Sequence, residues 1–328
     1  MVFLARRFGF YLVTAWAAIT MNFFIPRLMP GNPVELVIAR LSQNGVVSAG
    51  EVNALRAAFG LNTGASLVTQ YLQYWVHLAH GNLGTSITYY PSSVASVIAG
   101  ALPWTVALIG MATIISFVIG TVIGSMAAWR RGGWLETALP ATTFLQGAPY
   151  FWLGLLAIEV FGVKLGWFPV SGGYSQGTSI GFTGSFLASA AVHAVLPALT
   201  IVVTSMAGWI VGMRNVMLTT LGQDYVLVAQ AKGLSERRVM VTYAARNAIL
   251  PQVASFSIAL SLVVSGAVLV ELVFSYPGIG FVLLQAVENE DYPLMQAIFL
   301  VIVLSVLVAS LLADLVYVLL DPRSRQEA

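Results

Sequence analysis

The sequence predicts an all-α membrane protein with six transmembrane helices, and three observations support this fold class. Hydrophobic residues make up 58% of the 328-residue chain and charged residues only 9%, whereas a soluble domain is about one quarter charged. Six windows contain no Asp, Glu, Lys or Arg and have the length of a membrane span, which is roughly 20 residues. The basic residues gather on one side of these windows. Most of the protein surface is therefore expected to face lipid.

The six windows define the expected spans in chain order. They are Phe8–Ile25, Ala101–Trp129, Thr137–Ile158, Val192–Met213, Asn247–Val270 and Tyr292–Ala313. A further apolar stretch, from Leu165 to about Ala191, is rich in Gly, Ser and Thr. We expect a connecting loop there, because polar turn residues cannot satisfy their backbone groups in lipid. The first window is longer than a typical signal-peptide core, so we expect it to be retained as a span.

The distribution of Lys and Arg predicts that both termini are cytoplasmic. Cytoplasmic loops of membrane proteins carry an excess of these residues. With the N-terminus inside, the inner segments hold 11 of the 15 basic residues. These are Arg6, Arg7, Arg130, Arg131, Arg214, Lys232, Arg237, Arg238, Arg246, Arg323 and Arg325. The opposite orientation would reverse the ratio.

Four segments follow from these spans. Residues 1–28 form the N-terminal transmembrane helix, and residues 29–100 form a helical extracytoplasmic insertion. Residues 101–320 form a five-helix core that contains a cytoplasmic loop at 216–250, and residues 321–328 form a cytoplasmic tail.

Two short helices are expected in the insertion. Ser48 and Glu51 make a capping-box pattern before an apolar stretch that reaches Phe59. A second helix is expected from about Ser66 to His80, with Gly81 ending it. One face of this second helix carries Leu67, Tyr71, Tyr74, Trp75 and Leu78. Such a stripe at helical spacing indicates packing or interfacial anchoring rather than a ligand site.

Glycine and proline patterns suggest two further features. Gly120-x-x-x-Gly124 in the second span and Gly208-x-x-x-Gly212 in the fourth would let helices approach closely. Ser275–Gly280 is a turn cluster after the fifth span. It is compatible with a tight loop or with a short re-entrant element.

The inner loop Gly222–Pro251 is the longest cytoplasmic segment and carries much of the positive charge. Asp224 to Lys232 consists of good helix formers, and Gly233 should break that helix. Ser235 can cap a second helix that runs to Ile249, after which Pro251 opens the fifth span. Such a helix pair could be a simple positively charged anchor, or it could insert into a groove on a cytoplasmic partner.

This segment resembles the EAA loop of ATP-binding-cassette (ABC) importer permeases, specifically the dipeptide/oligopeptide/nickel branch. The matching residues are Asp224, Tyr225, Ala229, Ala231, Lys232, Gly233, Leu234, Arg246, Asn247, Ala248 and Pro251. Leu227 stands where the broader motif has its glutamate. Other stretches resemble the same family in order along the chain. They are Arg27–Pro33, Gly81–Ser86, Glu271–Gly280, Asp291–Pro293 and Asp321–Arg323.

The resemblance implies a type I importer permease with a MetI-like core in a prokaryotic inner or plasma membrane. The function it implies is to form half of a translocation pathway for a solute delivered by a binding protein, with di- or oligopeptides favoured. Oligosaccharides and nickel chelates are alternatives. The implied partners are a second homologous permease, two cytoplasmic ABC ATPase subunits, an extracytoplasmic binding protein and membrane lipid. ATP and Mg²⁺ would be bound by the ATPase subunits and not by this chain.

Two candidate sites follow. Residues expected to couple the permease to the ATPase are Asp224, Tyr225, Ala229, Ala231, Lys232, Gly233, Leu234 and Arg237. Residues expected at an outer gate or pathway are Glu271, Tyr276, Pro277 and Gly278. An acid in a membrane span is costly and indicates function by default. For Glu159 and Asp314, which also lie near span ends, structural pairing is favoured over transport.

Several other functions are disfavoured by the residues present. The chain has three scattered His and no Cys, so no metal site is expected. There is no P-loop pattern, so we expect no ATPase site and no enzymatic activity in this chain. A net charge of +2 gives no sign of a nucleic-acid partner. An ATPase-independent secondary transporter and a membrane scaffold remain alternatives, although the charges lie at the span edges rather than in mid-membrane.

Overall fold

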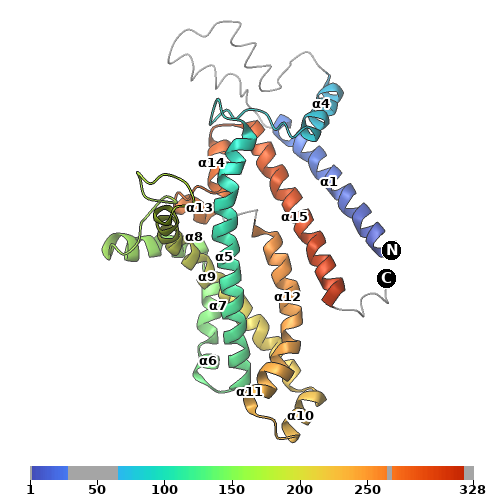
Figure 1. Cartoon of the computed structure of the whole chain (residues 1–328), viewed down its shortest axis with the longest axis vertical. Coiled ribbons are helices and arrows are strands. Elements are labelled where there is room, and N and C mark those ends of the chain that lie inside the picture. Colours follow the sequence, from blue (N-terminus) through green and yellow to red (C-terminus); the bar gives the residue numbers. More distant parts are fainter. Residues whose placement is uncertain (1, 29–65, 264–267, 321–328) are drawn as a thin grey trace. The chain divides into compact units, whose positions relative to one another are not determined.

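The computed structural model describes residues 2–28, 66–263 and 268–320. Its regular secondary structure over these ranges is helical, with one isolated β-bridge between Thr85 and Ser93. The chain divides into two compact units, one of residues 1–104 and 277–307 and the other of residues 105–276 and 308–328. Helices α5 (Val94–Trp129) and α15 (Tyr292–Leu320) contribute residues to both units (Figure 1).

The first unit contains α1 (Val2–Leu28), α4 (Leu67–Ala79) and α14 (Ile279–Glu288), with the first parts of α5 and α15. Its core is formed by the facing sides of α5, α14 and α15. The buried residues there include Val94, Ile98, Ile279, Val282, Leu294 and Ile298. Asn22 of α1 and Gln296 of α15 exchange two side-chain to backbone hydrogen bonds, of 2.7 and 3.0 Å.

Helix α4 confirms the expected helix at Ser66–His80. The hydroxyl of Ser66 accepts a bond from the N–H of Thr69 at 3.2 Å, and Gly81 follows the helix at a φ of 69°. The aromatic stripe packs on α1: the Tyr71 and Tyr74 rings lie 5.2 and 5.5 Å from Phe23. The packing interpretation of the stripe is therefore confirmed. The other expected helix, between Ser48 and Phe59, lies outside the described residues.

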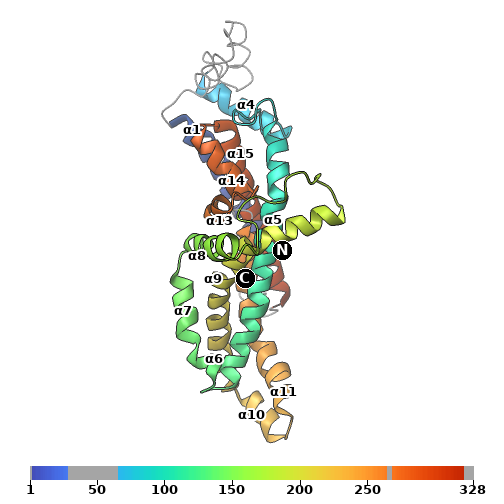
Figure 2. The ribbon, with the colours of Figure 1, turned by 90° about the vertical axis from the view of Figure 1, so that its left-hand side faces the viewer.

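The second unit is built around α9 (Gly184–Leu221). On one side of it lie α6 (Trp134–Thr137), α7 (Leu139–Gly147), α8 (Tyr150–Ala157) and the π-helical turn η1 (Ile158–Lys164). After α9 come α10 (Asp224–Ala231), α11 (Glu236–Arg238), η2 (Val239–Ala245), α12 (Arg246–Ser261) and α13 (Val268–Val273). Figure 2 shows α7 running beside α9.

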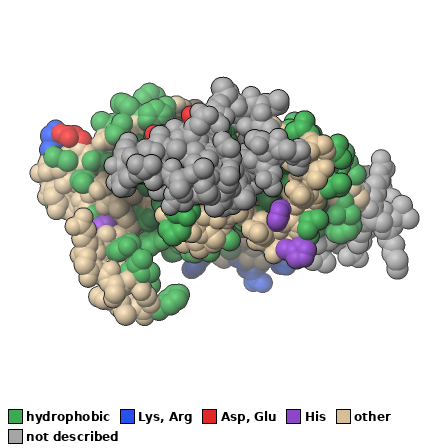
Figure 3. Space-filling model, turned by 90° about the horizontal axis from the view of Figure 1, so that it is seen from above, with side chains coloured by type: hydrophobic (Ala, Val, Ile, Leu, Met, Phe, Trp, Pro, Cys, Tyr) green, Lys and Arg blue, Asp and Glu red, His purple; other side chains and the backbone are tan. Residues whose placement is uncertain are grey.

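Three described helices are long and apolar enough to cross a membrane: Val94–Trp129, Gly184–Leu221 and Tyr292–Leu312. They correspond to the second, fourth and sixth expected windows. Many of their large hydrophobic side chains are exposed, as are those of Phe8–Phe24 in α1. Figure 3, a view from above, shows several separate patches of hydrophobic side chains among the described residues. This surface suits lipid rather than water.

The third expected window is not one straight helix. Residues 134–145 and 150–164 form two helical arms that meet at 99°. Ala148, just before Pro149, has an extended backbone with a ψ of 127°. Pro149 favours this break, since the pyrrolidine ring disfavours a helical conformation in the preceding residue. The window is a broken span or a re-entrant element.

Two boundaries also differ from expectation. The loop expected up to about Ala191 ends at Thr183, because the Thr183 hydroxyl accepts the N–H of Phe186 at 3.3 Å and starts α9. The fifth window, Asn247–Val270, does not form one continuous described helix. Helix α12 ends at Ser261 and α13 begins at Val268, with residues 264–267 outside the described part of the chain.

Candidate functional site

The first half of the inner loop forms a short helix that ends at a glycine. Helix α10 covers Asp224–Ala231, Lys232 is its C-terminal cap, and Gly233 follows at a φ of 70°. A side chain is strained in this left-handed conformation, which glycine adopts freely. The N–H of Gly233 bonds the carbonyl of Gln230 at 2.9 Å. The expected break at Gly233 is confirmed, and backbone conformation rather than crowding requires glycine there.

The second helix of the loop runs further than expected. Ser235 occupies the cap position but makes no side-chain cap bond, and α11, η2 and α12 follow one another without a gap from Glu236 to Ser261. Pro251 was expected to open a new span; instead it lies inside α12. A proline inside a helix costs one backbone bond but keeps a helix-compatible φ. α5 and α9 also run through prolines, Pro103 and Pro197.

One face of α10 is buried against the rest of the unit. Val226 and Ala229, three residues apart on that face, are almost fully buried. They pack in one cluster with Ala128 of α5, Met213 and Met217 of α9, and Val239, Ala244 and Ala248 of the second loop helix. The cluster seats the helix pair on the ends of α5 and α9.

The opposite face of α10 is exposed and mostly apolar. Tyr225 and Val228 are 41% and 51% exposed, and Lys232 lies one turn further along. Leu227 is also exposed, as are Arg237 and Arg238 after the glycine. Figures 1 and 2 both show α10 and α11 at one end of this unit, beyond the ends of α5 and α9. The loop therefore presents an apolar surface bordered by charged residues of both signs, since Asp224 and Glu236 are exposed as well.

The expected coupling residues thus divide between the two faces. Ala229 belongs to the buried seat, and Leu234 is half-buried beside it. The exposed ones are Asp224, Tyr225, Ala231, Lys232, Gly233 and Arg237. Sequence reasoning treated Ala229 and Ala231 alike, but only Ala229 lacks room for a larger side chain.

Helices α5 and α9, which carry this seat, are in close contact. A Cβ atom on Gly124 would lie 2.4 Å from the carbonyl oxygen of Ile210, and one on Gly120 would lie 2.5 Å from Cβ of Trp209. The expected close approach at Gly120-x-x-x-Gly124 is confirmed. Phe117 further stacks on Phe256 of α12 at 4.3 Å and meets Trp209 edge-on at 5.2 Å. Helices α5, α9 and α12 therefore pack closely against one another in the part of the unit that supports α10.

Two of the candidate outer-gate residues, Glu271 and Tyr276, belong to the second unit. Glu271 in α13 is fully buried, and its carboxylate accepts the hydroxyl of Thr105 in α5 at 2.7 Å. The N–H of Tyr276 bonds the backbone carbonyl of Glu271 at 2.7 Å, across a turn in which Ser275 has a φ of 46°. The N–H of Gly172, in the loop before α9, donates to the carbonyl of Phe274 at 2.8 Å.

The other two gate candidates belong to the first unit. Pro277 precedes Gly278, which is the N-cap residue of α14 (Ile279–Glu288). Glu159 pairs with Lys164 at 3.3 Å on an exposed surface. The side chain of Asp314 lies outside the described part of the structure. Within the described ranges no three His, Asp or Glu side chains gather into a possible metal site.

A buried hydrogen-bonded group around Asp291 in the first unit, the Asp291 cluster, was missed by sequence reasoning. Asp291 is fully buried and caps α15, accepting the N–H of Leu294 at 3.1 Å. Its carboxylate also accepts the hydroxyl of Ser86 and the N–H of Thr88, the latter at 2.8 Å. Burial, followed by the charge of Asp291, raises the pKa of Tyr89. The available signal was that Gly81–Ser86 and Asp291–Pro293 both carried family-like motifs.

Comparison with known proteins matches residues 120–326 to the family "Binding-protein-dependent transport system inner membrane component". A di/tripeptide transport system permease protein of Pseudomonas aeruginosa is 35% identical over 341 aligned positions, covering 99% of each chain. A putative peptide permease protein of Brucella suis is 35% identical over 302 positions, covering 92% of each chain. An oligopeptide transport system permease protein of Bacillus subtilis is 32% identical over 304 positions, covering 92% of each chain.

Proposed function

Because the chain belongs to the family of binding-protein-dependent transport system inner membrane components, we propose that it is a permease subunit of an ATP-driven peptide importer. The observation that carries the proposal is the helix pair around Gly233. The buried face of α10 packs on α5 and α9 through Val226 and Ala229, and its opposite face is apolar and exposed. Such a face suits insertion into a groove on another protein.

An importer of this kind needs several other proteins besides the permease. A binding protein delivers the solute, two cytoplasmic ATPase subunits bind ATP and Mg²⁺, and a second, homologous permease completes the pathway. Tyr225, Val228 and Lys232 meet an ATPase groove. We further propose that the termini and the Gly233 helix pair are cytoplasmic and that the chain crosses the membrane six times. The three long helices and the bent α7–α8 pair support up to four of these crossings, and we assign the other two to α1 and to α12 with α13.

ATP binding, acting through this surface, shifts the transporter between inward-open and outward-open states. Moving such an equilibrium from 1:99 to 99:1 takes about 5.5 kcal/mol of differential binding. Closure of the ATPase pair displaces α10, and the buried seat passes that displacement to α5 and α9. At the other side, Glu271 and Tyr276, followed by Pro277 and Gly278, shape the outer gate.

Peptide is the proposed substrate because the three relatives above are named as peptide, di/tripeptide or oligopeptide permeases. Oligosaccharides and nickel chelates are the alternatives for the same machinery. Binding measurements on the partner binding protein, with di- and tripeptides, oligosaccharides and nickel chelates side by side, discriminate among them.

Affinity purification and reconstitution test the proposal. A tagged chain should co-purify with ATPase subunits and a second permease. In proteoliposomes with the binding protein, labelled dipeptide should accumulate only when ATP is supplied. Uptake driven by an ion gradient without ATPase subunits would contradict the proposal and favour a secondary transporter. A purified chain without any of these partners would favour a scaffold.

A further inference from the structure

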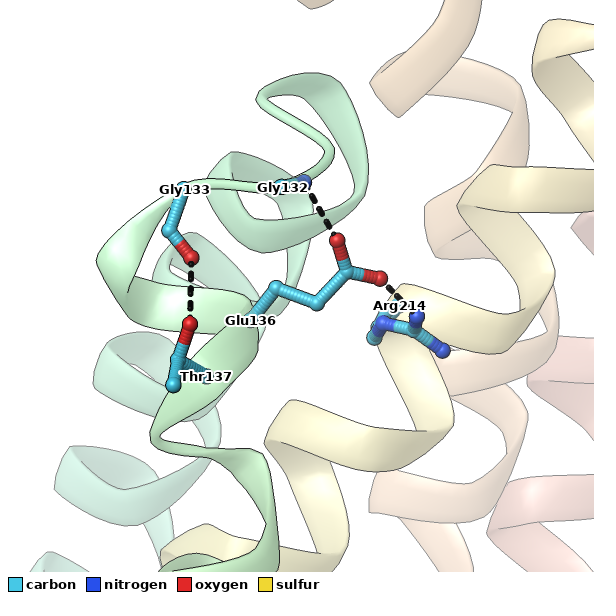
Figure 4. Close-up of polar contacts among 5 residues, drawn as sticks. All are labelled: Gly132, Gly133, Glu136, Thr137 and Arg214. Atoms are coloured by element: carbon cyan, nitrogen blue, oxygen red, sulfur yellow. Dashed lines mark hydrogen bonds and ion pairs between the residues drawn. The ribbon is translucent and has the colours of Figure 1, made fainter.

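A second polar contact in the unit that carries α10 joins segments that are distant in sequence. Glu136 of α6 forms an ion pair with Arg214 of α9. The other carboxylate oxygen of Glu136 accepts the backbone N–H of Gly132 at 2.6 Å (Figure 4). Gly132 has a φ of 74°, in the turn between α5 and α6. One carboxylate therefore holds this turn and α6 against α9.

The pair differs from the other described ion pair of this unit. The side chains of Arg214 and Glu136 are only 22% and 28% exposed, whereas those of Lys164 and Glu159 are 68% and 54% exposed. Exposed pairs contribute little because water screens them. A partly buried pair is screened less by water and salt, so it resists separation more than an exposed pair does.

Arg214 lies beside the seat of α10. Met213 and Met217, its neighbours on α9, are buried in the cluster with Val226 and Ala229. A Cβ atom on Gly124 of α5 would lie 3.2 Å from the backbone nitrogen of Arg214. The same stretch of α9 thus meets α5, supports α10 and bonds to α6.

We propose that Glu136 and Arg214 are positioning residues for coupling, which make α6 and α7 follow α9 when α10 is displaced. This inference rests on the proposed function. Helix α7 leads directly to the 99° break before α8. A link at Glu136 therefore transmits movement at α10 to the bent pair and not only to α5, α9 and α12.

The Arg214 side chain is held on one side only. Its Nη2 reaches Glu136, while its Nε is buried with no hydrogen-bond partner among the described residues. Neutralising Glu136 should therefore release the guanidinium from α6 without dismantling a wider network.

The first test uses the assembled transporter in proteoliposomes and measures peptide uptake per ATP hydrolysed. We expect Glu136→Gln and Arg214→Gln each to lower this ratio roughly tenfold, within the usual range of coupling between sites, while ATP hydrolysis continues. The double variant Glu136→Arg/Arg214→Glu restores the ion pair but leaves the Gly132 N–H without its acceptor, so it should recover part of the ratio. Glu159→Gln removes the exposed pair and should change nothing.

A second measurement separates positioning from mere stability. The chain has no cysteine, so Phe144→Cys on α7 and Leu199→Cys on α9 allow two spin labels at exposed sites. With Glu136 present, the distance between the labels should be the same before and after ATP trapping. With Glu136→Gln, a second distance should appear after trapping.

An unchanged uptake ratio in the single variants, or a single label distance in Glu136→Gln, would overturn the inference. Absence of ATP-driven uptake in the wild-type complex would instead overturn the proposed function, so the two failures can be told apart.

Discussion

The Asp291 cluster and the α10 surface use polar and apolar groups in opposite ways. Asp291 is fully buried, and donors from Ser86, Thr88 and Leu294 satisfy its carboxylate. On α10, Tyr225 and Val228 leave apolar area exposed at the end of a unit. The carboxylate of the first region is satisfied within the chain, whereas the second region is the surface that we propose binds a partner. Substitutions should therefore affect folding in the first region and assembly in the second.

The largest effect on stability is expected for Asp291→Ala. It strands three donors in a buried site, and each stranded donor costs about 1–3 kcal/mol. The temperature at which half of the detergent-purified chain loses its monodisperse peak should fall sharply. Asp291→Asn keeps an acceptor and should fall less. If Asp291→Ala and the wild type lose the peak at the same temperature, the cluster does not stabilise the fold.

A smaller effect is expected at the contact between α5 and α9. Gly124→Leu places its Cβ 2.4 Å from a backbone oxygen, which no side-chain rotation relieves. The cost should be about 1–3 kcal/mol, as for other overpacked sites, and ATP-driven uptake should be lost with it. Gly100→Ala in the same helix meets no atom within 4 Å and serves as the control. Equal stability of the two variants would contradict a tight contact here.

Ala229 and Ala231 test the comparison within a single helix, because the first is buried and the second is exposed. Ala229→Leu overfills the seat shared with Met213 and Met217, so it should lower both thermal stability and uptake. Ala231→Leu changes only the exposed side and should lower ATPase binding while the unfolding temperature stays at the wild-type value. Both are read by thermal unfolding and by co-purification of the ATPase. A stability loss in Ala231→Leu equal to that in Ala229→Leu would erase the distinction.

Local signals explain what could be predicted from sequence. The start of α4 at Ser66, the end of α10 at Gly233 and the six apolar windows rest on caps, backbone freedom and composition, which act over a few residues. Pro149 and Pro251 show the limit. Both lie within apolar stretches, yet one follows a helix break and the other lies within α12. The presence of a proline alone therefore does not tell whether a helix breaks.

The polar contacts of the candidate sites were harder to predict. Ser86 and Asp291 are 205 positions apart, and Glu136 and Arg214 are 78 apart. A single sequence contains each residue but not the folded path that joins them. The two faces of α10 were hidden for the same reason, because Ala229 and Ala231 differ only in what packs against them.

Site-directed cross-linking tests the central claim, which is that an ATPase subunit binds the exposed face of α10. The chain has no cysteine of its own, so Val228→Cys labelled before assembly carries the probe at a single site. A short thiol-reactive photocross-linker at residue 228 should yield a covalent adduct with the ATPase subunit. The same probe on Phe144→Cys should yield none. Adducts with lipid alone from residue 228 would contradict the claim.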